Sequence, residues 1–582
     1  MVASVLAFAE AHLALKGSSM TSSTVPVPSQ VRDDSRTNEA FPQLTPAQLA
    51  RVEPHGRRRR LAQGEVVGEP GQPVTKIFVV VSGQLDAVTP LQASTESMPR
   101  FTQGMFTGER SILSGGRFLG RISATVPTEV IEVERDELLK LIQTDTELSD
   151  VFLRAFILRR LQLIDRGYGD VVVLGSEHCS GTLHIREFLT RNGHPYTQRD
   201  LDTDPESQEL LDRFHLTVDD VPVVICRGKT VLKNPTIQEL ADCLGLNPTL
   251  DHTQIWDVVI IGAGPAGLGA AVYAASEGLN VLIIEANAPG GQAGTSSNIE
   301  NYLGFPLGIS GQELAGRAYD QAQKFGARVL IAKRAVRLGC DRKPFHVLLD
   351  GADGDAVLAR AVIIATGVEY RKLAMDNLHR FENAGVYYAA TQMERRMCAD
   401  DEVAVVGGAN SAGQAAVFLA ETAKRVHMLI RSDALSSTMS RYLISRIDAH
   451  PRIEQHTRTE IVDLEGNGHL ERVSWRTGPG GPVATQNIRH VFTMTGAEPS
   501  TGWLAGCVTL DGKGFVKTGA ALTVDELVAA KWPLPRQPYL LETSIPGVLA
   551  VGDVRSGSTK RVASAVGEGS IAVATLHQVL NG

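Results

Sequence analysis

Residues 258–267 read VVIIGAGPAG, an apolar and largely β-branched stretch that runs directly into a glycine-rich turn. A helical pattern follows, and a second apolar stretch at residues 281–284 ends in the acidic residue Glu285. Strand, glycine-rich turn, helix, second strand and terminal acid form the pattern of a dinucleotide-binding βαβ unit. This unit predicts an α/β fold for the C-terminal half of the chain.

The three glycines of this turn have separate roles in binding a dinucleotide. Gly262 permits the tight turn, Gly264 lets the backbone approach a pyrophosphate, and Gly267 lets helix and strand pack closely. The pyrophosphate would rest on the N-terminus of the helix that follows, where unpaired N–H groups favour an anion. The acid at the end of the second strand is placed to accept from a ribose hydroxyl.

A second glycine-rich turn follows the apolar residues 403–406 and predicts a second dinucleotide site. Its residues are Gly407, Gly408, Ala409, Asn410, Ser411 and Ala412. Ala409 replaces the usual middle glycine, so the pyrophosphate would lie slightly further from the backbone. The next apolar stretch ends in Arg431 instead of an acid. A guanidinium suits a 2′-phosphate, so NADPH is favoured and NADH is the alternative.

Composition limits the function classes. The 582 residues are 43% hydrophobic and 21% charged, and the net charge of −8 gives no general support for binding nucleic acid. The basic run at residues 57–60 is expected to be a solvated edge. No apolar stretch is long enough to span a bilayer. Residues 1–17 lack the basic region of a signal peptide, Met20 is a second candidate start, and residues 18–40 are typical of a disordered lead-in.

The six cysteines are sparse, and none lies within three residues of another. The chain therefore has no Cys-x-x-Cys motif and no zinc knuckle, and no metal site is expected. This cysteine usage favours a reducing, cytoplasmic location.

Further motifs resemble low-molecular-weight thioredoxin reductases over about 325 residues. They are Gly290-Gly291-Gln292, the run ENYLGFP at residues 300–306, Ala365-Thr366-Gly367, Gly552-Asp553 and Arg561-Val562-Ala563. The resemblance implies two nested Rossmann-like domains, bound FAD, hydride passing from NADPH to the flavin, and a homodimer. It implies FAD contacts at Gly262, Gly264, Pro265, Ala266, Gly267, Glu285, Gly291, Gln292, Asn301, Thr366, Gly367, Gly552, Asp553, Arg561, Val562 and Ala563.

The same resemblance aligns residues 385–392 with the redox-active segment of that family. Ala389 and Gln392 stand where the two cysteines would be. A thiolate is needed to attack a disulfide, and neither residue can form one. Cys398 lies six residues further on and is expected to be a packing cysteine. The usual exit for electrons is therefore missing from the sequence.

Residues 169–246 resemble a thioredoxin or glutaredoxin fold. Cys179 stands near the start of an expected helix, where the helix dipole favours a thiolate, and Pro222 matches the cis-proline of that family. Thr182 occupies the position of the resolving cysteine, so a two-cysteine mechanism is excluded. A monothiol role for Cys179 and a degenerate docking module remain as alternatives.

Residues from Phe41 onward resemble cyclic-nucleotide-binding domains. Gly108 and Glu109 match the start of the phosphate cassette, in which a glutamate takes the ribose hydroxyl and an arginine takes the phosphate. Arg117 and Arg121 are both candidates for that arginine, and neither falls at the expected spacing. Binding of a cyclic nucleotide and a structural role for the domain both remain open.

The fold class is therefore multidomain, with a β-roll, a thioredoxin-like α/β domain and two Rossmann-like domains. The expected boundaries are 1–40 for the leader, 41–167 for the cyclic-nucleotide-binding-like domain, 168–248 for the thioredoxin-like domain, 254–370 with 496–582 for the FAD domain, and 371–495 for the NAD(P)H domain. The sequence predicts an FAD-dependent oxidoreductase whose acceptor, a small molecule or a redox protein, meets the flavin directly. Two alternatives are a thioredoxin-disulfide reductase using Cys179 or partner cysteines, and a cyclic-nucleotide-gated redox sensor.

Overall fold

The computed structural model describes residues 39–88, 100–108, 111–114, 117–118, 120–165, 171–176, 179–201, 220–226, 230–247, 250–296, 299–351, 356–375, 377–382, 384–388, 390, 392–435, 439–467 and 469–581. The predicted lead-in up to residue 38 lies outside these residues. The chain forms two compact units. The first contains the described residues up to 175 together with 192–250 and 320–332, and the second contains 176–191, 251–319 and 333–582.

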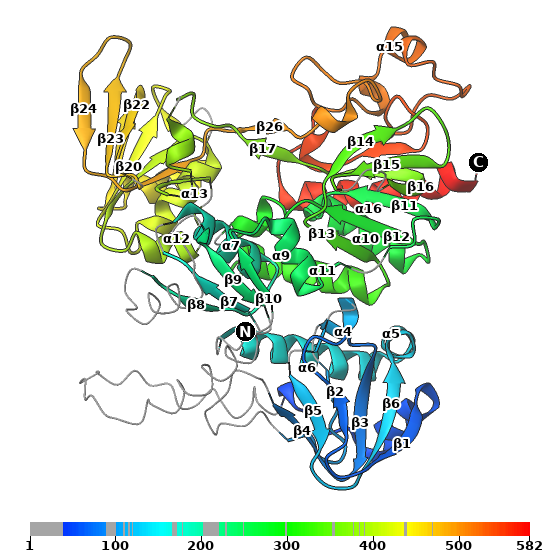
Figure 1. The fold of residues 1–582 in the computed structure, drawn as a ribbon. Coiled ribbons are helices and arrows are strands. Elements are labelled where there is room, and N and C mark those ends of the chain that lie inside the picture. Colours follow the sequence, from blue (N-terminus) through cyan, green and yellow to red (C-terminus); the bar gives the residue numbers. More distant parts are fainter. Residues whose placement is uncertain are drawn as a thin grey trace, which may run out of the picture. The chain divides into compact units, whose positions relative to one another are not determined.

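The first unit begins with a β-roll of two antiparallel sheets (Figure 1). One sheet has the order β1 (Arg57–Leu61), β6 (Thr128–Glu134), β3 (Lys76–Ser82), and the other has the order β2 (Val66–Gly68), β5 (Arg121–Ala124), β4 (Leu85–Val88). The helices of this part are α3 (Pro46–Val52), η1 (Glu53–His55), α4 (Ser111–Ser114), α5 (Arg135–Thr144) and α6 (Thr146–Asp165). Phe106, Phe152 and Phe156 are fully buried and pack edge to face or tilted in its core.

The basic run at residues 57–60 lies in the edge strand β1. Its four arginines are exposed. Arg58 pairs with Glu53 at 2.6 Å and Arg59 with Glu132 at 2.7 Å. The expectation of a solvated edge agrees with this arrangement, since exposed charges on an edge strand oppose pairing with another chain.

A second sheet in the first unit has the order β10 (Thr230–Lys233), β9 (Val223–Cys226), β7 (Val171–Leu174), β8 (Thr197–Arg199). β7 runs parallel to β8 and antiparallel to β9. The peptide bond between Val221 and Pro222 is cis, as the sequence resemblance implied for Pro222. The unit also contains α9 (Ile237–Leu244), which begins at a capping box of Thr236 and Glu239, and β13 (Arg328–Ile331).

The second unit contains a sheet with β11 (Ile255–Ile261) at its centre. β12 (Val281–Glu285) and β16 (Ala356–Ile364) run parallel to β11 on its two sides, and β27 (Val548–Ala550) runs parallel to β16. β15 (Phe345–Leu349) and β14 (Ala335–Gly339) continue the sheet antiparallel. Most of β11 is buried, as expected for a near-continuous apolar strand covered on both faces.

Two helices of this domain, α10 (Pro265–Ser276) and α16 (Val562–Asn581), lie side by side (Figure 1). A Cβ at Gly569 would lie 2.4 Å from the Ala266 carbonyl oxygen, so the close approach of the two helices requires glycine there. This packing brings the C-terminal helix of the chain against the helix that follows the first glycine-rich turn.

A second sheet of five strands is entirely parallel, in the order β18 (Val386–Tyr387), β25 (His490–Thr493), β19 (Glu402–Val406), β20 (Arg425–Ile430), β21 (Ile453–Thr457). An antiparallel meander of β22 (Thr459–Glu465), β23 (Arg472–Thr477) and β24 (Val483–Gln486) follows. β17 (Val368–Tyr370) and β26 (Ala497–Pro499) pair where the chain enters and leaves this domain.

The other elements of the second unit are mainly short. They are α7 (Ser180–Arg191), η3 (Ala293–Thr295), η4 (Leu378–Arg380), α12 (Gln392–Met397), α13 (Asn410–Leu419), α14 (Arg441–Asp448), η6 (Gly502–Leu504), η7 (Gly519–Ala521), α15 (Val524–Ala529), η8 (Gly552–Val554) and most of α11 (Gly311–Lys324). Among the described residues, no helix has the length and apolar character needed to cross a membrane.

Candidate functional site

The first glycine-rich turn has the geometry that the sequence predicted. Gly262 follows β11 with a φ of 106°, and a Cβ at Gly267 would lie 1.9 Å from the Gly262 carbonyl oxygen. Gly264 is the N-cap of α10. A Cβ at Gly264 would lie 3.9 Å from the Gly291 Cα, so a second loop lies against the first turn. The first N–H groups of α10, which have no partner within the helix, therefore lie close to the backbone of the loop at Gly291.

Glu285 ends β12 and lies beside this turn. Its Oε2 accepts from the Ala263 N–H at 2.8 Å, and its Oε1 accepts from the Asn287 N–H at 2.9 Å. Burial raises the pKa of Glu285, and the two backbone N–H groups oppose that rise. The carboxylate thus organises the turn, and its remaining lone pairs suit a hydroxyl group of a ligand.

Three further predicted flavin contacts lie around the link between the two sheets. The Gln292 side chain donates to the Val368 carbonyl, at the start of β17. Thr366 Oγ1 donates to the Ser500 carbonyl at 2.9 Å, and Gly367 has a φ of 63°. Asn301 is exposed in the loop after Ile299. The first bond therefore joins the loop at Gln292 to β17. The second joins the residue before Gly367 to the residue after β26.

The C-terminal contacts lie where β27 ends and α16 begins. Gly552 N–H donates to Glu568 Oε2 at 2.7 Å, and its φ is 73°. Burial raises the pKa of Asp553, and the Lys560 ammonium opposes the rise. Arg561, Val562 and Ala563 stand at the N-terminus of α16.

These groups fit a flavin dinucleotide. Glu285, Asp553 and the first turn all follow parallel strands at their carboxyl ends, which is the binding edge of such sheets. Helix N-termini for the phosphates and carboxylates for the hydroxyl groups are the donor and acceptor set that FAD requires. When bound, FAD would supply a two-electron carrier at this edge.

The second glycine-rich turn connects β19 to α13. Gly407 has a φ of 142°, and a Cβ there would lie 2.5 Å from the Met494 carbonyl oxygen. Gly408 comes next, and Ala409 is the N-cap of α13, whose first turn contains Asn410, Ser411 and Ala412. Arg431 is exposed directly after β20. The turn and the arginine are therefore arranged as a second dinucleotide site.

A family model described as pyridine nucleotide-disulphide oxidoreductase matches residues 256–569, which is more than half of the chain. The chain belongs to this family of oxidoreductases. A second family model, the cyclic nucleotide-binding domain, matches residues 58–145. The protein therefore combines this oxidoreductase domain with a cyclic nucleotide-binding domain near its N-terminus.

Individual proteins are also similar to this chain over part of its length. Thioredoxin reductase from Ureaplasma parvum is 32% identical over 324 residues, which cover 55% of this chain and 96% of the relative. Thioredoxin reductase from Bacillus subtilis is 31% identical, with 56% and 96% covered. The crystal structure of Lactococcus lactis thioredoxin reductase is 25% identical with a TM-score of 0.49, covering 56% of this chain and 99% of that one.

The oxidoreductase has no cysteine at either position of the expected dithiol. Ala389 lies outside the described residues, and Gln392 is the first residue of α12. Cys398 is fully buried in the core of the parallel five-stranded domain, and burial raises its pKa to about 12. A thiol of this kind stays protonated at neutral pH and cannot act as a nucleophile. The expectation that Cys398 is a packing residue agrees with its burial.

Cys179 lies immediately before α7 and is partly exposed. Its carbonyl accepts from Leu183 N–H at 3.0 Å, and Thr182 is buried in the first turn of the helix. At the other end of α7, Arg191 donates to the Gly291 carbonyl at 3.1 Å and the Thr190 carbonyl accepts from Gln312 at 2.7 Å. The helix that carries Cys179 is therefore attached to the loop of the predicted flavin site.

The predicted cyclic-nucleotide contacts are only partly described, since Glu109 lies outside the described residues. Arg117 Nη1 donates to the Gly71 carbonyl at 2.9 Å. Arg121 is exposed and pairs with Glu69 at 3.0 Å. Both candidate arginines thus contact groups of the protein itself, and the structure does not choose between them.

Sequence reasoning missed Arg159 of α6, which is 4% exposed. Its guanidinium donates to the carbonyl groups of Ala40, Phe106 and Gly108 at 2.7 to 2.9 Å. It also lies 4.7 Å from the centroids of the Phe41 and Phe106 rings. Arg159 therefore fixes the segment that leads into the predicted phosphate cassette. A lone arginine in an amphipathic helix gives no local signal for this role.

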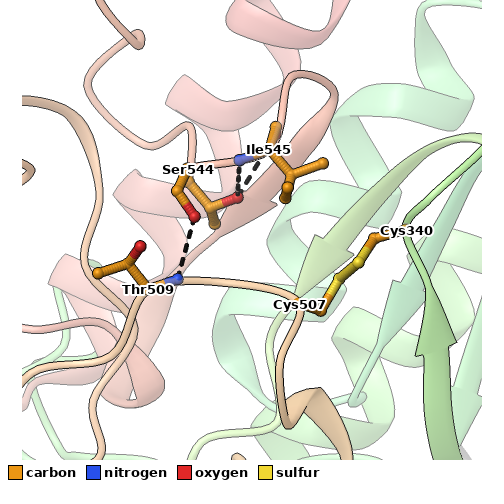
Figure 2. The surroundings of a disulfide bond; sticks show 6 residues. Cys340, Cys507, Thr509, Ser544 and Ile545 are labelled. Carbon is orange, nitrogen blue, oxygen red and sulfur yellow. Dashed lines mark hydrogen bonds between the residues drawn. A yellow bond between two sulfur atoms is a disulfide. The ribbon is translucent and has the colours of Figure 1, made fainter. Parts of the chain in front are cut away.

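The sequence also missed a disulfide between Cys340, after β14, and Cys507, after η6 (Figure 2). Their Cα atoms lie 6.0 Å apart, and 167 positions separate them along the chain. Cysteine spacing suggested no pair, because the two residues meet only through the tertiary fold. The sparse cysteines favoured a reducing location, whereas the structure contains this disulfide.

Proposed function

We propose that the protein passes electrons from NAD(P)H to an external acceptor that meets the flavin directly, without a dithiol in the NAD(P)H domain. The observation that carries the proposal is the absence of both expected cysteines, together with the burial of Cys398, which raises the pKa of its thiol. Glu285 and the first glycine-rich turn would hold FAD, and the second turn would hold the nicotinamide dinucleotide. Arg431 favours NADPH over NADH because a guanidinium can bind a 2′-phosphate.

The acceptor is a small molecule or a redox protein. From the family resemblance we also propose a homodimer. Light scattering on the purified protein would test this by measuring its molar mass. A cytoplasmic location is proposed from the sparse cysteines alone.

An anaerobic NADPH titration followed by acceptor assays tests the proposal. Flavin absorbance should bleach, and added quinone, oxygen or dye should restore it at a rate that Cys179→Ser leaves within about twofold of the unmodified chain. Cys243→Ser, another partly exposed thiol, is the matched control. A loss of turnover that is confined to Cys179→Ser would reject direct transfer.

A second candidate function is disulfide reduction through Cys179. It is supported by the attachment of α7 to the Gly291 loop and by the partial exposure of the thiol. The cis bond before Pro222 and the strand order of the β10 to β8 sheet support the resemblance of residues 169–246 to a thioredoxin fold. In the same assays, Cys179→Ser should then abolish reduction of a disulfide substrate while leaving dye reduction intact.

The third candidate is gating by a cyclic nucleotide, which rests on the matched family model at residues 58–145. Calorimetric titration of the full chain with cyclic AMP and cyclic GMP tests it. Binding that changes the rate of flavin reduction would support gating, and the absence of heat at millimolar ligand would reject it.

A further inference from the structure

Two histidines and a glutamate come together in the second unit, on strands β20 and β21. His427 pairs with Glu454 in the parallel register, and His456 follows two residues later on β21. Because side chains at positions i and i+2 of a strand share a face, the backbone itself places these three groups together. None of them belongs to the predicted dinucleotide sites.

The ligand atoms of the three side chains converge. His427 Nδ1 lies 3.1 Å from His456 Nε2, and the Glu454 carboxylate lies 3.5 Å from His456 Nε2 and 3.9 Å from His427 Nδ1. All three atoms lie within 4.8 Å of one another. In a tetrahedral Zn²⁺ site, bonds of about 2.0 to 2.2 Å place ligand atoms about 3.3 Å apart. The cluster therefore has close to the spacing that a bound cation would impose.

The surroundings of His427 fix which of its nitrogens is available. His427 Nε2 lies 3.3 Å from Glu402 Oε2, and Lys424 Nζ lies 3.0 Å from Glu402 Oε1. In the tautomer whose Nε2–H donates to Glu402, Nδ1 of His427 presents its lone pair to the cluster. Metal-binding histidines commonly have such a carboxylate behind them, because it orients the ring and raises its basicity.

One side of the cluster is exposed at the surface, where a cation can enter, and the other side is buried. The His427 side chain is 7% exposed, whereas that of Glu454 is 46% exposed. The ring of Trp475, on β23, lies 5.5 Å from both imidazole rings. Besides Glu402, Arg425 is a charged group in contact with the cluster, and its Nη1 lies 2.9 Å from Glu454 Oε2.

We propose that His427, Glu454 and His456 form a binding site for a divalent transition cation of the Zn²⁺ type, with a water molecule as the fourth ligand. Two imidazoles and one carboxylate are a set that Zn²⁺ accepts, and Mg²⁺ and Ca²⁺ prefer oxygen alone. The cation joins β20 to β21 just before Arg431 and acts as a structural clamp of this domain. The rival arrangement is a hydrogen bond from His456 Nε2 to His427 Nδ1 with no cation.

The test uses the full flavin-containing chain, stripped with a chelator and then titrated with ZnCl₂. Bound zinc per chain is measured by atomic emission, and thermal unfolding is followed with and without zinc. About one equivalent should bind, and the melting temperature should rise by several degrees because the native state binds the cation. CoCl₂ should give the ligand-field bands of a tetrahedral site at wavelengths beyond the flavin absorption.

Variants make the test specific. His456→Ala and Glu454→Gln should each lower zinc affinity at least tenfold and lose the thermal shift, while His469→Ala, a histidine 3.8 Å from Glu471, should change neither. If His456→Ala does not retain flavin, the zinc affinity and the thermal shift of Glu454→Gln alone test the proposal, because Glu454 is exposed. Zinc binding that both cluster variants retain, or the absence of stoichiometric binding, would overturn the proposal.

Discussion

Single residues set the geometry of the two dinucleotide sites. At Gly267 the reason is steric, since any side chain would overlap the Gly262 carbonyl oxygen, which lies 1.9 Å from an ideal Cβ. At Arg431 the reason is electrostatic, because this exposed guanidinium follows the strand end where an acid would otherwise accept a ribose hydroxyl.

Gly267→Ala should remove bound flavin and destabilise the chain by more than about 2 kcal/mol, because the clash is with backbone that cannot turn aside. The ratio of flavin to protein absorbance and urea unfolding measure the two effects. Gly567→Ala, on α16 with no atom within 4 Å of its Cβ, is the control and should be neutral or stabilising by up to about 1 kcal/mol. Full flavin retention in Gly267→Ala would contradict the assigned turn.

Arg431→Ala should raise the KM for NADPH by roughly 10- to 100-fold and leave that for NADH unchanged, because one charge-assisted contact to the 2′-phosphate is lost. Steady-state kinetics with both nucleotides measure the change. Arg472→Ala, an arginine paired with Glu465 on the meander, should change neither value. Equal changes in the KM for NADPH and for NADH would show that Arg431 does not bind the 2′-phosphate.

Cys398 should resist alkylation in the folded protein. With a pKa near 12, its thiolate fraction at pH 8 is about 10⁻⁴. Cys179 is partly exposed and serves as the reactive comparison in peptide mapping by mass spectrometry. Because the folded pKa is raised, the thiol favours the native state below pH about 8.5 and this contribution falls as pH rises toward 12. Labelling of the two cysteines at the same rate at pH 8 would disprove the burial argument.

At the scale of elements, the packing of α6 against the segments that contain Ala40 and Phe106 depends on the buried guanidinium of Arg159. Arg159, which is almost fully buried, links α6 to residues 106–108 by donating to the Phe106 and Gly108 carbonyl groups. The aromatic rings around it add cation–π attraction.

Arg159→Ala should destabilise the cyclic nucleotide-binding domain by about 3 to 5 kcal/mol, since it leaves buried carbonyl groups without donors. Arg154→Ala lies on the same helix, where Arg154 forms an exposed pair with Asp150, and should cost less than about 1 kcal/mol. Thermal unfolding of the two full-length variants distinguishes them. Equal melting temperatures of the two variants would show that Arg159 does not stabilise the domain in this way.

At the scale of the whole molecule, the Cys340–Cys507 bond closes a loop of 167 positions within the second unit. Cross-linking so long a loop restricts the unfolded chain strongly, and such bonds stabilise by about 2 to 5 kcal/mol.

Cys340→Ser should therefore lower the free energy of unfolding by about 2 to 5 kcal/mol under oxidising conditions, and Cys507→Ser should match it. In the presence of a reductant, the unmodified chain should fall to the level of the variants, which urea unfolding would show. The bond also bears on the titration with NADPH. Bleaching at about two equivalents in the unmodified chain and one in Cys340→Ser would show that the flavin reduces this disulfide. Identical stability with and without reductant would show that the bond adds nothing to the fold.

The sequence by itself determined the two glycine-rich turns, the strands before them, Glu285, Arg431 and the absence of a Cys-x-x-Cys motif. These features are local, because turn sterics and strand pattern act over a few neighbouring residues. The tertiary structure alone decided the Cys340–Cys507 bond, the buried role of Arg159 and the His427, Glu454 and His456 cluster. Their partners are far apart in the chain or on adjacent strands, and only the parallel register and the packed core bring their side chains within bonding distance.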